Sequence, residues 1–189
     1  MQQDYLESIK KQFAYYKLLG DNTFSQLSNE ELLWKYNEES NSISTIVNHL
    51  WGNMLSRWTD FITEDGEKVW RNRDAEFEET IKTRTELLDK WEAGWRCLFM
   101  ALESINDANF HSTIYIRNQG HTVIEAVNRQ LAHYAYHVGQ IVYVGRMMKG
   151  QNWKSLSIPK GKSVLFNAEK FSKKRHKSHF TDEFLEPKK

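Results

Sequence analysis

The chain has 189 residues, 40% hydrophobic and 27% charged, which is enough for one sizeable core under a solvated surface. Its formal net charge of +1 excludes an overall attraction to nucleic acid or anionic membranes. The single cysteine, Cys97, excludes an intramolecular disulfide, and no proline interrupts a helix before Pro159.

The N-terminal part of the chain carries a helical pattern. Apolar residues at spacings of three and four predict an amphipathic helix over residues 4–27. Ser28, followed three residues later by Glu31, has the form of a capping box. A short helix through residues 32–33 is therefore expected next.

A second long helix is expected to begin at Ser42 or Ser44 and to reach Phe61, with an apolar stripe along one side. The polar stretch 63–67 breaks this pattern, and a polar connection continues to Asp74. A crossover of this length lets two neighbouring helices run parallel.

The third long helix is predicted over residues 78–105 from its apolar face. The β-branched stretches 113–116 and 121–123 flank the polar turn 117–120, which contains a glycine. This pattern predicts a small β-hairpin.

The fourth long helix is expected to run from Thr122 or Val123 to Met148, with Gly150 placed to cap its end. Together these elements predict an all-α protein, a four-helix bundle over residues 1–160. Its long crossover joins the second and third long helices, and the small hairpin precedes the fourth. Residues 161–189 are expected to form a basic C-terminal tail that is in part mobile.

The N-terminus shows no basic region followed by an apolar run, and no apolar stretch approaches the roughly 20 residues of a membrane span. The sequence therefore predicts a cytoplasmic protein without a membrane segment. Because no aromatic residues alternate with basic ones in a groove-like pattern, nucleic acid is not an expected partner.

Three histidines on two of the predicted helices have the spacing of a metal site. His133 and His137 lie one turn apart, about 6 Å along the helix axis, so both can reach one ion. The zinc-peptidase motif places Glu after the first histidine, but here that residue is Tyr134, which argues against such a peptidase. His49, in the second long helix, is the best third ligand.

Three neutral imidazoles would leave an ion its full charge and an open coordination position, which is the catalytic pattern. Imidazole suits zinc, nickel, iron and copper, so the ligand type does not choose among them. The alternative for each histidine is an ordinary core residue with its polar atoms satisfied.

The order of these histidines, one in the second helix and a His-x-x-x-His pair in the fourth, resembles the DinB/YfiT-like superfamily over about residues 1–150. Segments similar to those of an uncharacterised DinB-like subgroup are residues 57–61, 65–67, 70–74 and 157–163. The resemblance implies a four-helix bundle with a crossover between helices two and three. It also implies one divalent metal ion on His49, His133 and His137, with zinc or nickel first and iron or manganese next.

Some members of the superfamily are thiol S-transferases that use bacillithiol or mycothiol, and one is a thiol-dependent isomerase. The resemblance thus favours a metal-dependent enzyme, thiol S-transferase-like, that activates a small thiol or water. The alternative is a non-catalytic metal-binding stress-response protein that acts through a partner or a dimer. A small-molecule substrate and a homodimer are the partners that these hypotheses imply.

Polar residues near the predicted ligands are candidates for a substrate pocket. Asn53, one turn after the histidine of the second helix, can bond a substrate or a neighbouring backbone group. Arg129, one turn before the histidine pair, can neutralise an anionic substrate or form an exposed ion pair. Arg57 is expected to pair with a carboxylate such as Asp60.

Four further residues have a structural and a functional interpretation. The guanidinium groups of Arg71 and Arg73 suit carboxylate or phosphate recognition, but anchoring the crossover is the favoured role. Tyr136, pointing about 100° away from its histidine neighbour, is expected in the core. Cys97 is expected to be a small core residue and not a nucleophile.

Overall fold

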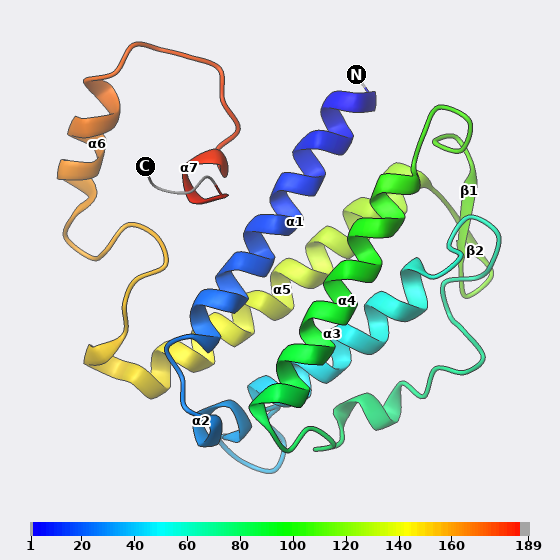
Figure 1. Cartoon of the computed structure of the whole chain (residues 1–189), viewed down its shortest axis with the longest axis horizontal. Helices are drawn as coiled ribbons and strands as arrows, with labels where there is room; N and C mark the ends of the chain where they lie inside the picture. The colour runs from blue at the N-terminus through cyan, green and yellow to red at the C-terminus, as the bar shows by residue number, and fades with distance from the viewer. Residues whose placement is uncertain (1, 186–189) are drawn as a thin grey trace.

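The computed structural model of the chain describes residues 2–185 and is mostly helical, with one small antiparallel pair of strands. Four long helices lie side by side within this described range (Figure 1). They are α1 (Gln2–Phe24), α3 (Ile43–Trp58), α4 (Arg84–Ser104) and α5 (Val123–Lys149). The shorter helices are α2 (Asn29–Leu33), η1 (Asp74–Phe77), η2 (Gly150–Asn152), α6 (Ser163–Phe171) and α7 (Asp182–Leu185).

The long helices share one core. Helix α3 packs mainly on α4 and α1 mainly on α5, while α3 also contacts α5 and α1 contacts α4. At the centre, the buried ring of Trp95 lies edge-on to Phe13, Trp91 and Tyr134, with centroid separations of 6.4, 5.3 and 6.0 Å. Such edge-to-face contacts add to the burial of large apolar rings. In the range 2–185, no helix is both long and apolar enough to cross a membrane.

Polar caps fix where the long helices begin. The Ser42 side chain accepts the Thr45 N–H at the start of α3, and Thr122 with Glu125 forms a capping box at the start of α5. Gly150 ends α5 with a φ of 52°, a conformation that suits glycine. The starts predicted at Ser42 and Val123 thus agree with the structure.

Three predicted boundaries were wrong. The second long helix ends at Trp58 and not at Phe61, since the chain turns after Thr59 and Asp60 has a φ of 45°. The first helix ends at Phe24 and not at Leu27, since the chain turns there, with the Leu27 N–H donating to the Phe24 carbonyl. The third long helix begins at Arg84 and not near Glu78, because Thr83 and Glu86 form the capping box that starts it. The residues before it belong to the crossover.

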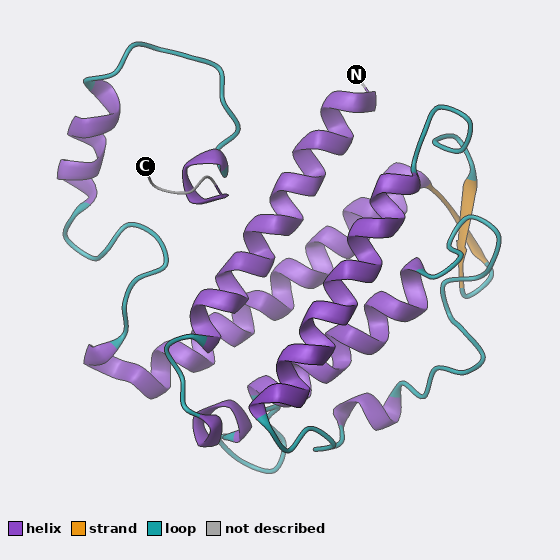
Figure 2. Cartoon of the chain, viewed as in Figure 1, coloured by secondary structure: helices purple, strands orange, loops and turns teal. Residues whose placement is uncertain are grey.

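The hairpin has a tighter turn than predicted. Strands β1 (Thr113–Ile116) and β2 (Gln119–Thr122) form the one pair of strands in the described chain (Figure 2). They run antiparallel, with Ile116 opposite Gln119. The two turn residues, Arg117 and Asn118, have φ values of 55° and 58°. Two successive residues with positive φ form the kind of two-residue turn whose twist matches that of the paired strands. The turn therefore needs only Arg117 and Asn118, and Gln119 and Gly120 belong to strand β2.

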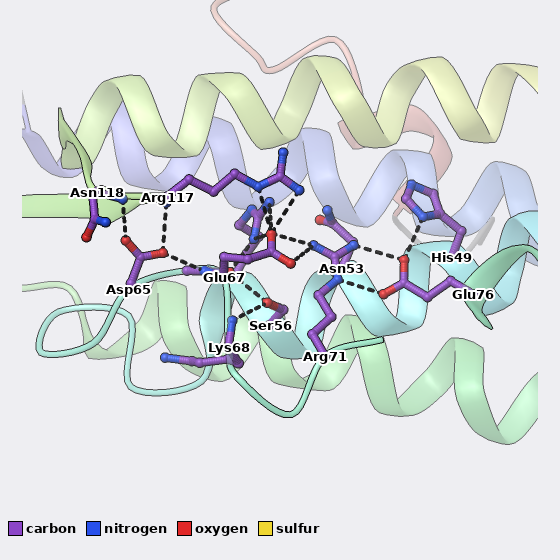
Figure 3. A network of polar contacts seen from close by, with 12 residues as sticks. His49, Asn53, Ser56, Asp65, Glu67, Lys68, Arg71, Glu76, Arg117 and Asn118 are labelled. Atoms are coloured by element: carbon purple, nitrogen blue, oxygen red, sulfur yellow. Dashed lines mark hydrogen bonds and ion pairs between the residues drawn. The ribbon is translucent and has the colours of Figure 1, made fainter. Parts of the chain in front are cut away.

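The crossover between α3 and α4 is held to the rest of the chain by polar contacts. Ser56 Oγ donates to the Gly66 carbonyl at 2.7 Å. The Asp65 carboxylate accepts the backbone N–H groups of Arg117 and Asn118, each at 2.8 Å (Figure 3). The crossover is therefore fastened both to helix α3 and to the tip of the hairpin.

Residues 161–185 contain two short helices that the sequence pattern did not predict, α6 and α7. Helix α7 contacts α1, where Lys11 pairs with Asp182 at 2.7 Å and Ser8 Oγ lies 3.0 Å from His179 Nε2. The boundary at residue 160 and the mobility of the tail stay predictions. Residues 186–189 of that tail lie outside the described residues.

Candidate metal centre

The three predicted histidines come together in space. Helix α3 carries His49 midway along its length, and α5 carries His133 and His137 one turn apart. One ring nitrogen of each lies within 4.8 Å of the others, and His49 Nε2 is 3.2 Å from His133 Nε2. The three side chains are therefore close enough to hold one metal ion. His49 is buried and the other two are half-buried.

Hydrogen bonds on the far side of two rings orient them toward this point. His49 Nδ1 lies 2.9 Å from Glu76 Oε2, and His137 Nδ1 lies 2.8 Å from Gln140 Oε1. Because both partners are acceptors, each Nδ1 carries the proton and each Nε2 lone pair remains for the centre. A histidine whose outer nitrogen donates to a carboxylate or carbonyl is the usual arrangement of a metal ligand.

Glu76, which belongs to η1, is itself held in place. Arg71 donates to both of its oxygens, from Nε at 2.7 Å and from Nη2 at 2.9 Å, as Figure 3 shows. Burial works to raise the pKa of this carboxyl, but the hydrogen bonds from His49 and Arg71 outweigh it and the pKa is lowered. An ionised carboxylate thus supports the His49 ring.

A glycine makes room for this carboxylate. A Cβ at position 52 would lie 2.4 Å from Glu76 Oε1 and 2.8 Å from its Cδ. Real atoms do not approach so closely, and the carboxylate is fixed by two partners. Gly52 on helix α3 therefore lets the crossover pass near enough for Glu76 to reach His49, one turn earlier on the same helix.

The pKa values of the two half-buried histidines are low. Burial, together with the neighbouring His137 and His49, lowers the pKa of His133 to about 3. Burial and His49 lower the pKa of His137 to about 4, although the bond to Gln140 opposes the shift. Both rings are therefore uncharged near neutral pH, the form that binds metal ions.

These pKa values predict an acid-sensitive metal-free protein. Below about pH 6.5 the unfolded chain protonates both histidines, whereas the folded chain does so only near pH 4 and pH 3. The contribution of the two neutral histidines to the free energy of unfolding is thus fully present above pH 6.5. It should be lost progressively as the pH decreases toward 4. Urea unfolding of the metal-free protein at about pH 7 and about pH 5 measures this.

The matched control for this experiment is the double variant His133→Asn, His137→Asn. Its free energy of unfolding should change less between the two pH values, since asparagine does not titrate there. An equal change in the wild type and the double variant would show that other groups cause the acid sensitivity.

The three histidines face a cavity of about 280 Å³ between helices α3 and α5 and the crossover. Its other walls are mostly basic and polar. The arginines that line it are Arg57, Arg71, Arg73, Arg117 and Arg129, and the remaining residues are Asn53, Phe77 and Gln130. A small molecule in this cavity would touch the histidine nitrogens and several guanidinium groups at once.

The predicted pocket residues Asn53, Arg57 and Arg129 all line this cavity, with partners that differ from the expected ones. Asn53 Oδ1 accepts a hydrogen bond from the Tyr134 hydroxyl at 3.1 Å. Arg129 lies 3.0 Å from His121 Nε2 and forms no ion pair within residues 2–185.

The sequence suggested that Arg57 pairs with a carboxylate such as Asp60, but the carboxylate that it contacts is Glu67. Arg57 donates to the Gly66 carbonyl and, from both terminal nitrogens at 3.1 Å, to Glu67. The physical reason is the crossover, which folds back over α3 and brings these acceptors to the buried guanidinium. Asp60 lies past the end of the helix, exposed and with a φ of 45°.

Tyr136 and Cys97 were both predicted to be core residues, and the structure gives the exposure of each. Tyr136 is 63% exposed, so its assignment to the core was wrong. The position points outward from α5, and the buried tyrosine is Tyr134, whose hydroxyl accepts from Trp58 Nε1 at 3.0 Å. Cys97 is half-buried, and burial raises the pKa of its thiol, which suits a packing residue and not a nucleophile.

Sequence reasoning missed the residues that support the site. Glu76, Glu67, Arg117 and Gln130 were not singled out, and anchoring the crossover was the favoured role of Arg71. The one available signal was the acidic and basic alternation between residues 71 and 76, which allows a local salt bridge. Nothing in that pattern shows that the same carboxylate also reaches His49.

A protein-family model described as a protein of unknown function (DUF1572) matches residues 1–162, a range that includes all three histidines. That family is in the DinB-like fold family. No curated protein and no solved structure matches the chain.

Proposed function

The chain belongs to the DUF1572 family, and on this premise we propose a divalent-metal-dependent enzyme that activates a small thiol, or water, at His49, His133 and His137. The observation that carries the proposal is the convergence of three imidazoles at the wall of a cavity. We also propose that the four long helices form a four-helix bundle of the DinB/YfiT-like type. The crossover between α3 and α4 and the places of the three histidines support that assignment.

The donor set fits one divalent ion. Three nitrogen atoms converge, and in two of the rings the opposite nitrogen is engaged by an oxygen acceptor. His49 Nε2 and His133 Nε2 lie 3.2 Å apart. Their lone pairs would repel each other at this distance unless a cation or a proton lies between them. An all-imidazole set suits zinc and nickel, and then iron or manganese, better than calcium or magnesium, which take oxygen ligands.

The arrangement has the form of a catalytic site because it leaves a coordination position for a substrate. The metal-holding group within residues 2–185 contains three residues, whereas structural zinc sites are closed by four. A divalent ion bound here would lower the pKa of a thiol or water beside it. The neutral histidines do not diminish the charge of that ion, and Glu76 lies behind His49, away from the open side.

The chain's own residues would orient the substrate and limit water access. Phe77 stacks on the His49 ring, with centroids 4.7 Å apart, and forms an apolar part of the cavity wall. Asn53 is held by the buried Tyr134 hydroxyl, so its amide has a fixed place one turn beyond His49. Such fixed side chains hold a bound molecule in one orientation at little entropic cost.

The test compares metal content and turnover in three proteins purified without a nickel column. The wild type and His111→Ala, which removes an exposed histidine, should carry about one ion per chain. His137→Ala should carry much less, because two ligands remain. Turnover in a thiol-conjugation assay, with hydrolysis of an activated ester as the second assay, should fall in the same variant.

Equal rates for the wild type and His137→Ala would reject the catalytic proposal. Stoichiometric metal without turnover in either assay would favour the non-catalytic metal-binding protein. Wild-type protein that stays metal-free in the presence of zinc and nickel would reject the metal site itself.

A further inference from the structure

The cavity beside the three histidines is lined by more positive charge than its neighbours neutralise. Arg57 and Arg71 lie buried at its base, with side chains 7% and 2% exposed. The exposed side chains of Arg73, Arg117 and Arg129 line its mouth. Guanidinium groups stay charged at all physiological pH values, so this positive charge is permanent.

Two carboxylates offset part of that charge. Glu67 accepts from Arg57, Arg71 and Arg117, each at 3.1 to 3.2 Å. Glu76 accepts hydrogen bonds from Nε and Nη2 of Arg71 and from Nδ1 of His49. These contacts give three of the five arginines a structural role, because they fasten the crossover and the hairpin to helix α3.

Arg73 and Arg129 are different, since neither forms an ion pair within residues 2–185. The Arg73 guanidinium lies over the Phe77 ring, 5.3 Å from its centroid, and the same ring stacks on His49. Arg129 lies one turn before His133 on α5, and its Nη1 lies 3.0 Å from His121 Nε2. The two arginines without an ion pair therefore line the same cavity from different elements, Arg73 just before η1 and Arg129 on α5.

Two buried polar atoms of the cavity wall also lack partners. Gln130 is 3% exposed, and its Oε1 forms no hydrogen bond within the described chain. The same is true of Arg57 Nε. Buried polar atoms are nearly always satisfied in folded proteins, so unsatisfied ones at a cavity indicate a place where a ligand or water binds.

We propose that this cavity binds a small molecule through an anionic oxygen group, a carboxylate or a phosphate, held by Arg73 and Arg129 beside the three histidines. The proposal rests on the proposed function for the identification of that molecule as the substrate. The planar guanidinium matches two oxygens of either group, and a volume of about 280 Å³ suits a molecule the size of a dicarboxylic acid. A neutral substrate would leave the excess charge uncompensated.

The test measures binding of succinate, its uncharged diamide succinamide, and inorganic phosphate by isothermal titration calorimetry. Each titration uses protein as purified and protein freed of metal, at about 0.05 M salt. The variant is Arg73→Gln with Arg129→Gln. The matched control is Arg146→Gln with Arg96→Gln, which removes the same charge from exposed positions on α5 and α4 that do not line the cavity.

Succinate or phosphate should bind at least about tenfold more tightly than succinamide to the wild type and to the control variant. The preference should largely disappear in the Arg73, Arg129 variant and should shrink at about 0.5 M salt. The better of the two anions identifies the carboxylate or the phosphate. Equal binding of succinate and succinamide, or a preference that the Arg73, Arg129 variant retains, would overturn the proposal.

This outcome is separate from the fate of the proposed function. Arginine-dependent anion binding by the metal-free protein would stand even if His137→Ala left turnover unchanged. Conversely, metal-dependent turnover with no preference for anions would leave the catalytic proposal in place and reject this one.

Discussion

Replacement of Glu76 by alanine is expected to weaken metal binding by about 10- to 100-fold. The carboxylate fixes the His49 ring through Nδ1 at 2.9 Å, and without it the ring can rotate and take the other tautomer. The same change leaves the Arg71 guanidinium, whose side chain is 2% exposed, with Glu67 as its one remaining carboxylate. The metal-free protein should therefore lose about 3 kcal/mol of unfolding free energy.

Metal affinity is measured by competition with a chelator, and stability by urea unfolding of the metal-free protein. Glu76→Gln is the second variant if the alanine variant folds poorly. It removes the charge that pairs with Arg71 but keeps an amide oxygen that can accept from His49, so it separates the effect on metal affinity from the effect on stability. Glu78→Ala is the matched control, because Glu78 is exposed and forms no ion pair in the described chain. Unchanged metal affinity in both Glu76 variants would mean that this carboxylate has no part in the metal site.

Replacement of Trp91 by alanine is expected to cost about 3–5 kcal/mol of unfolding free energy. This indole is 2% exposed, meets Phe24 edge-on at 5.1 Å, and donates to Asp21 Oδ1 at 2.7 Å. It also lies so close to Gly20 that a Cβ there would be 2.4 Å from the ring. The indole therefore joins α4 to α1, and alanine would leave a large cavity between them.

Metal affinity should change little in folded Trp91→Ala protein, because the ligands lie on α3 and α5 and not on the two helices that the indole joins. Trp70→Ala is the control, since Trp70 is 56% exposed and should alter stability by less than about 0.5 kcal/mol. Similar unfolding midpoints for the two tryptophan variants would contradict the described contact of α1 with α4.

The long helices were predictable because each carries an apolar stripe and a polar cap. The stripe depends on spacing alone, and the caps of Ser42 and Thr122 are local hydrogen bonds within a few residues. His133 and His137 were predictable for the same reason, since a helix places residues four apart on one face. His49 needed more than spacing within one helix: its place in the second long helix made it the best third ligand, and the resemblance to a helical superfamily implied the same residue.

The residues behind and around the histidines could not be predicted in the same way. Glu76 lies in a short 3₁₀ helix inside an irregular crossover, where no periodicity indicates direction. Its contact with His49 joins positions 27 residues apart. Arg117 reaches Glu67 across 50 residues, through a turn whose conformation depends on two positive φ angles. Such contacts depend on the path of the crossover, which charged side chains and not apolar spacing determine.

The basic wall of the cavity and its histidines belong to different kinds of structure. The ligands stand on two core helices, whereas Arg71, Arg73 and Arg117 stand on a crossover and a hairpin tip held by hydrogen bonds and salt bridges. Substitutions in those outer segments can alter which molecule enters without disturbing the hydrophobic core. Under the proposed function, a different crossover grafted onto α3 and α4 would change which molecule binds while the three histidines stay in place.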